Sequence, residues 1–164
     1  MLGWDHLLLL LGFIILSNSA RNLIVAITGF TIGHSVTLLV VGFDLFRLSA
    51  VFVEAMIAAS LVLLAYEIRK SSNKSTVKNL LLLAVVFGLF HGMGFANTAA
   101  QLFEPGQQMI LNLVAFNVGI EVGQILFVSL ALMLLSIVRF ERIRGWLSFG
   151  IGSLGSFYLI SALA

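Results

Sequence analysis

Long apolar runs alternate with short polar segments along the whole chain. An α-helix needs about 20 mainly apolar residues to cross the hydrocarbon core of a bilayer. The pattern therefore predicts six membrane-spanning helices, of which the first is the shortest. They cover approximately Gly3–Ser17, Asn22–Gly42, Leu48–Ile68, Val77–Phe103, Met109–Val138 and Gly145–Leu163. A break in the fourth helix is expected near its glycines, Gly88, Gly92 and Gly94.

Composition supports this interpretation. The chain is 60% hydrophobic and only 10% charged, whereas soluble domains carry about 25% charged residues. The predicted fold class is an all-α, polytopic membrane helix bundle, with residues 1–164 forming a single transmembrane domain. The lipid bilayer is the expected partner, together with further copies of the chain or other membrane subunits. The sequence contains no cysteine, which excludes disulfides and thiolate metal sites.

The basic residues indicate an orientation. All Lys and Arg except Arg47 fall in, or directly beside, the segments that follow the first, third and fifth predicted helices. Loops rich in Lys and Arg stay in the cytoplasm, so both termini are predicted to lie outside. The expected location is the bacterial inner membrane. The excess of basic residues is thereby explained by topology, and no nucleic-acid partner is expected.

Two pairs of segments resemble each other. Phe30–Val36 aligns with Phe116–Val122, and Gly3–His6 aligns with Gly88–His91. The matches predict a 3+3 inverted repeat with units 1–70 and 77–164, an arrangement that places binding sites at the interface of the repeats in many transporters. Chance similarity between apolar helices is the alternative.

Six ionisable residues lie within the apolar segments. Each costs roughly 3 kcal/mol near the bilayer centre, so such residues are usually functional. At 1.5 Å per residue, the residues on the second to fifth helices reach similar depths, and the first two residues lie at the outer end of the first helix. The predicted metal ligands are Asp5, His6, His34, Glu54, His91 and Glu121.

Polar residues near these positions are predicted to support the ligands. They are Thr31, Ser35, Asn97, Asn117 and Gln124. Imidazole and carboxylate without thiolate favour a divalent metal ion. The structural alternatives are interfacial roles for Asp5 and Glu54, and helix–helix hydrogen bonding by His34 and His91.

Several motifs resemble those of the HupE/UreJ membrane proteins. They are Gly3–Leu8, Phe30–Leu38, Glu54 with Ile57–Ser60, Phe87–Ala96 and Phe116–Gln124. The resemblance implies a nickel or cobalt permease linked to hydrogenase and urease maturation. It also implies that the six ionisable residues form the functional set.

Three functions are therefore considered. The favoured one is a permease for a divalent transition-metal ion, with nickel first and cobalt or zinc as alternatives; the ion would be the transported substrate. The second is a zinc-dependent intramembrane hydrolase, in which zinc activates water. The third is a structural subunit of a membrane complex.

Overall fold

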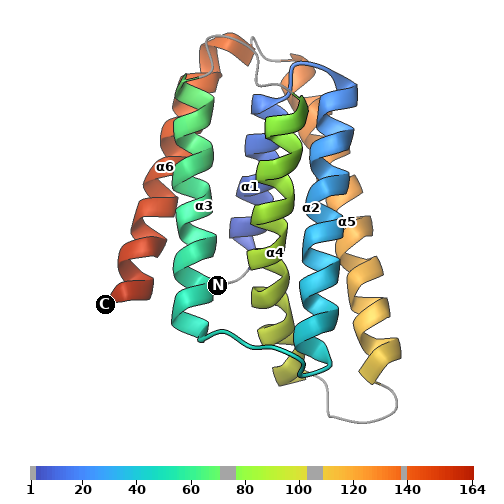
Figure 1. Ribbon diagram of the computed structural model, residues 1–164. Coiled ribbons are helices and arrows are strands. Elements are labelled where there is room, and N and C mark those ends of the chain that lie inside the picture. The colour runs from blue at the N-terminus through green and yellow to red at the C-terminus, as the bar shows by residue number, and fades with distance from the viewer. Residues whose placement is uncertain (1–2, 71–76, 103–108, 138–139) are drawn as a thin grey trace.

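The computed structural model describes residues 3–70, 77–102, 109–137 and 140–164, and these residues form an all-α bundle (Figure 1). The six helices are α1 (Trp4–Leu16), α2 (Ala20–Gly42), α3 (Ala50–Lys70), α4 (Val77–Leu102), α5 (Met109–Ile137) and α6 (Phe140–Leu163). The predicted fold class is confirmed. Five helices are long and apolar enough to cross a membrane, whereas α1 is a shorter apolar helix of 13 residues.

Helix α1 occupies only part of the bundle's length. It begins near the middle of the bundle and runs toward the end that holds the α1–α2 connection (Figure 1). Asp5 and His6 lie in the first turn of this helix, at the end away from the α1–α2 connection, but the expectation that this end lies at the outer surface is wrong. They lie deep inside the bundle, and both side chains are buried.

The tightest helix pair is α2 with α4, and glycine makes it possible. A Cβ atom at Gly88 would lie 2.3 Å from the Phe30 carbonyl oxygen, and one at Gly92 would lie 2.2 Å from the His34 carbonyl oxygen. The Thr37 hydroxyl donates a hydrogen bond across this contact to the Leu89 carbonyl, at 2.8 Å. Small residues allow such close approach between membrane helices. The expected break in α4 is wrong: the helix is continuous, and its glycines serve packing.

The remaining helices surround this pair less closely. Helix α6 packs on α3, where Ser148 Oγ donates to the Ala65 carbonyl at 3.0 Å and Arg144 donates to the Ile68 carbonyl at 3.0 Å. Helix α5 contacts α1 and α2. These contacts leave much of the outer apolar surface of α5 and α6 exposed, as expected for helices that face lipid.

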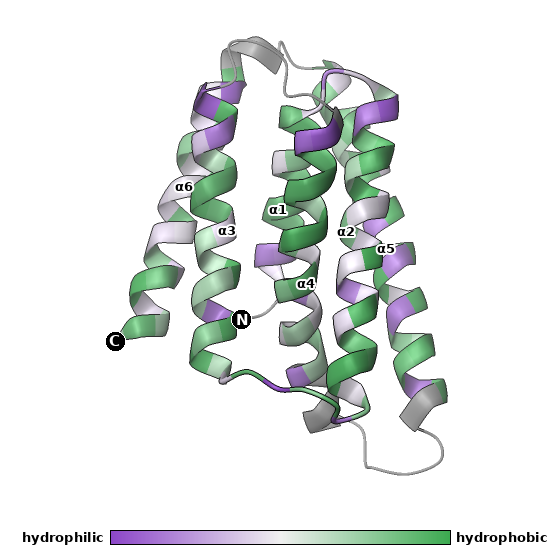
Figure 2. Cartoon of the chain, viewed as in Figure 1, coloured by the Kyte–Doolittle hydropathy of each residue, from purple (hydrophilic) through white to green (hydrophobic). Residues whose placement is uncertain are grey.

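Hydrophilic residues collect at one end of the bundle (Figure 2). This end is called the basic end, because it carries Arg21, Arg69, Lys70, Lys78 and Arg144. Lys74 and Arg139, which contribute to the predicted charge bias, lie outside the described residues. Arg47 lies in the α2–α3 connection at the opposite end, where it pairs with Asp44.

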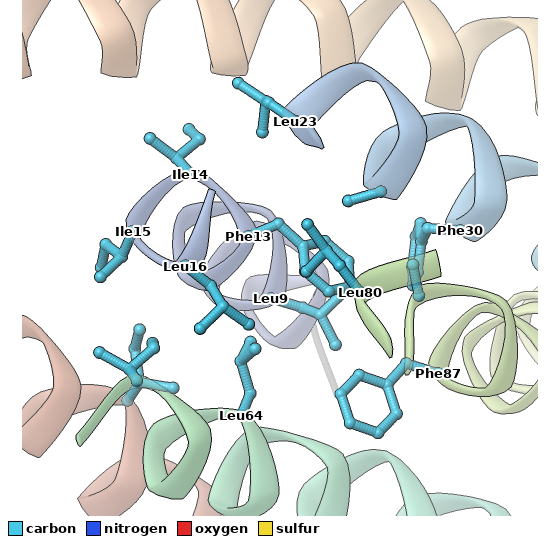
Figure 3. Packing of buried hydrophobic residues seen from close by; sticks show 14 of the residues in the cluster. Leu9, Phe13, Ile14, Ile15, Leu16, Leu23, Phe30, Leu64, Leu80 and Phe87 are labelled. Atoms are coloured by element: carbon cyan, nitrogen blue, oxygen red, sulfur yellow. The ribbon is translucent and has the colours of Figure 1, made fainter. Parts of the chain in front are cut away.

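Large apolar side chains fill the bundle between its centre and the basic end. Figure 3 shows how some of them pack against one another. The apolar plug is the part of this core formed by Leu9, Phe13, Phe30, Leu64, Leu80 and Phe87. All six side chains are almost completely buried. They come from α1, α2, α3 and α4, so the plug joins these four helices.

Candidate metal centre

Three imidazole rings gather at the centre of the bundle. The His6 ring lies 6.2 Å, centroid to centroid, from both the His34 and the His91 rings. Their residues are 5%, 0% and 2% exposed, respectively. They come from α1, α2 and α4, and the close α2–α4 contact brings the last two together. We call the space around these rings the imidazole chamber.

The hydrogen bonds of two rings determine which nitrogen carries the proton. His91 Nδ1 lies 2.9 Å from the Phe87 carbonyl oxygen; a carbonyl only accepts, so Nδ1 donates. His34 Nε2 lies 3.0 Å from Asn117 Oδ1 and donates to it. Asn117 is held in turn by Ser35, because Asn117 Nδ2 donates to Ser35 Oγ at 3.0 Å. Each ring therefore presents its other nitrogen as a lone pair.

Those lone pairs have no partner within the described structure. The unpaired buried atoms include His34 Nδ1, His91 Nε2, both ring nitrogens of His6, and Gln124 Oε1. Leaving a buried polar group unsatisfied costs roughly 1–3 kcal/mol. Histidines that bind metal typically donate their second N–H to a carbonyl, carboxylate or water, as His34 and His91 do here. A bound cation is one group that could satisfy these atoms.

The rings have not converged on a single point. Among the described residues, no group of three or more His, Asp or Glu side chains is already placed to hold one ion. Coordination would therefore require rotation of the rings about their side-chain bonds.

Two phenylalanines flank the imidazole chamber, and the sequence interpretation did not identify them. The Phe30 ring lies 5.0 Å from His6, 5.4 Å from His34 and 5.3 Å from His91. Phe95 lies on the other side, 5.2 Å from His6 and 6.0 Å from His34. Both occupy positions four residues from a histidine, which places each on the same helix face as that histidine. This spacing was the available signal.

A pocket adjoins the chamber on the side away from the basic end. Its volume is about 290 Å³, and its lining includes Asp5, Glu54, His91, Phe95 and Asn97. Asp5 is buried and its carboxylate accepts the backbone N–H of His6 at 3.0 Å. Glu54 is exposed in the described structure. The structure thus brings two predicted carboxylates and Asn97 next to His91, but not into the chamber. We call this pocket the vestibule.

Glu121 lies apart from both groups. It lines a separate pocket between α2 and α5, together with Thr28, Thr31 and Gln124. Gln124 Nε2 donates to Thr31 Oγ1 at 3.3 Å, and the Gln124 side chain also lies next to the His6 ring. Gln124 therefore stands between the chamber and the Glu121 pocket.

The fold and the buried histidines define a helical membrane protein with a candidate cation site at its centre. A comparison with protein-family models matched the HupE/UreJ family over residues 1–163, and the chain belongs to that family. Membership implies a membrane protein related to nickel or cobalt transport. Searches of curated proteins and of solved structures gave no match.

Proposed function

We propose that this protein is a permease for a divalent transition-metal ion, with nickel favoured and cobalt or zinc as alternatives. One observation carries the proposal: the imidazole chamber is buried and contains several unpaired acceptor atoms, and the hydrogen bonds to Asn117 and to the Phe87 carbonyl leave one lone pair on each of His34 and His91. A neutral imidazole lone pair is the form of histidine that binds these metals.

The proposed route begins in the vestibule. Asp5 and Glu54 attract the hydrated ion by their charge, and Asn97 adds an amide oxygen or nitrogen to the lining. The ion then passes Phe95 and enters the chamber, where His6, His34 and His91 replace part of its water shell. Asn117, held by Ser35, fixes the tautomer of His34. Passage to the basic end requires the apolar plug to open.

The proposed orientation follows the charge bias. The basic end faces the cytoplasm of a bacterial inner membrane and the vestibule opens to the outside, with both termini on that outer side. Transport in this direction would be uptake.

Uptake of labelled nickel, cobalt and zinc into vesicles tests the proposal. Reconstituted wild-type protein should raise nickel uptake above that of protein-free vesicles, and His34→Ala should abolish the increase. Thr37 lies on the same helix as His34, and Thr37→Ser keeps the hydrogen bond to the Leu89 carbonyl on α4, so this variant should retain uptake.

The other two hypotheses give different results in the same experiment. A zinc-dependent hydrolase would retain tightly bound zinc and transport none of the metals. A structural subunit would neither bind nor transport them. Equal uptake by wild type and His34→Ala would reject the chamber as the site of transport.

A further inference from the structure

His6 differs from the other two chamber histidines in how its ring is held. His34 donates to Asn117 and His91 donates to the Phe87 carbonyl, so each of these rings has one nitrogen fixed. Within the described structure, both ring nitrogens of His6 are unpaired, although the residue is only 5% exposed. A metal-binding histidine usually has a partner on its second nitrogen, because that bond orients the ring and leaves the first nitrogen as a lone pair. A residue with this role for His6 should lie beside its ring.

Gln124 on α5 has the position and the free atom that this role requires. Its side chain lies next to the His6 ring, and the residue is 2% exposed. The amide nitrogen donates to Thr31 Oγ1 at 3.3 Å, whereas Oε1 has no partner among the described residues. An amide oxygen only accepts and an imidazole N–H donates, so the two unpaired groups are complementary. A hydrogen bond between them would satisfy both and would leave the other nitrogen of His6 free for a cation.

The surroundings of Gln124 repeat those of Asn117. The Asn117 amide nitrogen donates to the Ser35 hydroxyl on α2, and the amide oxygen accepts from His34. The Gln124 amide nitrogen likewise donates to a hydroxyl of α2, which leaves its oxygen available to a histidine. Because α2 and α5 run in opposite directions (Figure 1), the earlier hydroxyl of α2, Thr31, meets the later amide of α5. The same arrangement of amide and hydroxyl therefore occurs twice between these helices.

We propose that Gln124 is the positioning residue of His6: its Oε1 accepts a hydrogen bond from one ring nitrogen of His6, while Thr31 holds its amide group. The inference rests on the proposed function, because the oriented ring is taken to bind the transported ion. Helix α5 then orients two of the three rings, whereas His91 is held by a carbonyl of its own helix.

Nitrogen NMR of the imidazole rings in the purified, metal-free, full-length chain tests the hydrogen bond. The chain contains three histidines, so His6→Ala identifies the signals of His6. The wild type should show His6 in a single tautomer, because a bond to Gln124 fixes which nitrogen carries the proton. Gln124→Leu should change the His6 signals to those of a tautomer mixture and leave the signals of the other two histidines unchanged.

Threonine variants repeat the test with a smaller change to the core. Thr31→Val removes the hydroxyl that holds Gln124 and should shift the His6 signals in the same direction, whereas Thr31→Ser keeps the hydroxyl and should give wild-type signals. Thr28→Val is the matched control, because it makes the same change about one turn earlier on α2, where the side chain is exposed. It should also give wild-type signals.

Nickel affinity, measured by isothermal titration calorimetry, relates the hydrogen bond to the proposed function. Gln124→Leu should weaken nickel binding by about 10–100-fold, as the loss of such a partner does at other metal sites. Thr31→Ser and Thr28→Val should bind nickel as the wild type does.

Different results would overturn the inference and the proposed function. Unchanged His6 signals in both Gln124→Leu and Thr31→Val, or unchanged nickel affinity in Gln124→Leu, would overturn the inference and leave the proposed function intact. Shifted signals from all three histidines would mean that Gln124 only supports packing of the bundle, which also overturns the inference. A wild-type chain that binds no nickel would overturn the proposed function, and the NMR signals of the metal-free chain would still decide the hydrogen bond.

Discussion

The two sides of the imidazole chamber are closed in different ways. Toward the basic end, the apolar plug stacks large buried side chains from four helices (Figure 3). Toward the opposite end, the vestibule lined by Asp5, Glu54 and Phe95 reaches His91 itself. In the proposed permease, this difference would admit an ion from the vestibule and block its exit at the basic end.

The position of α1 accounts for this asymmetry. Helix α1 begins near the middle of the bundle and fills the half nearest the basic end (Figure 1). Its residues Leu9 and Phe13 contribute to the plug, while Asp5 and Gly3, at its start, line the vestibule. One short helix thus contributes to the thick barrier and borders the open side.

The strongest test of the comparison uses Phe30 and Phe95. Phe30 is fully buried in the plug, so Phe30→Ala should lower the free energy of unfolding by about 3–5 kcal/mol. Phe95 is only half-buried, and Phe95→Ala should cost clearly less. Circular dichroism during unfolding in mixed micelles measures both values. Equal losses would show that the two barriers are equally packed.

Thiol accessibility compares the vestibule and the apolar plug directly. The chain contains no cysteine, so each single substitution creates one reporter. Ile57 lines the vestibule and Leu64 lies in the plug, two helical turns apart on the same face of α3. A membrane-impermeant thiol reagent should modify Ile57→Cys faster than Leu64→Cys by about 100-fold, an opening cost near 2.7 kcal/mol. Similar rates would contradict the assignment of a closed basic side.

Substitution of Asn117 tests whether its hydrogen bond to His34 supports metal binding in the imidazole chamber. Removing a group that orients a metal-binding histidine usually weakens metal affinity by about 10–100-fold. Asn117→Ala should show this loss for nickel in isothermal titration calorimetry, because His34 Nε2 loses its acceptor. Asn112→Ala on another face of α5 should bind nickel as the wild type does. Unchanged affinity in Asn117→Ala would mean that the hydrogen bond has only a structural role.

Substitution of Glu54 should give the smallest effect of these variants on nickel transport. It is exposed, so Glu54→Gln removes a charge that attracts the ion rather than a buried ligand. Nickel uptake should fall a few-fold at low ionic strength and approach wild type at high salt, because exposed charges are screened. Glu67→Gln should leave uptake unchanged. A salt-independent, complete loss in Glu54→Gln would instead indicate direct coordination.

The sequence predicted the helices well, because each long apolar run is bounded by polar residues. Predicted and observed bounds of α2 and α4 differ by at most two residues. The depth of α1 was missed because every helix was taken to start at the membrane surface. That assumption misplaced His6, which the structure places level with His34 and His91.

For the candidate residues on α2 to α5, the sequence allowed a prediction of depth but not of the direction in which each side chain points. Counting residues gave Glu121 a depth similar to that of His34, yet depth does not determine which side of a helix faces the chamber. Phe30 and Phe95 were missed because the sequence does not distinguish an apolar residue that packs against a histidine from one that faces lipid. The inverted repeat remains a prediction.

X-ray absorption spectroscopy of the protein loaded with one nickel ion per chain shows whether the three histidines bind the ion. We expect imidazole scattering from about three rings in the wild type, falling to about two in His91→Gln, since each histidine supplies one nitrogen ligand. A first shell of oxygen atoms without imidazole scattering, or a spectrum unchanged in His91→Gln, would contradict this expectation.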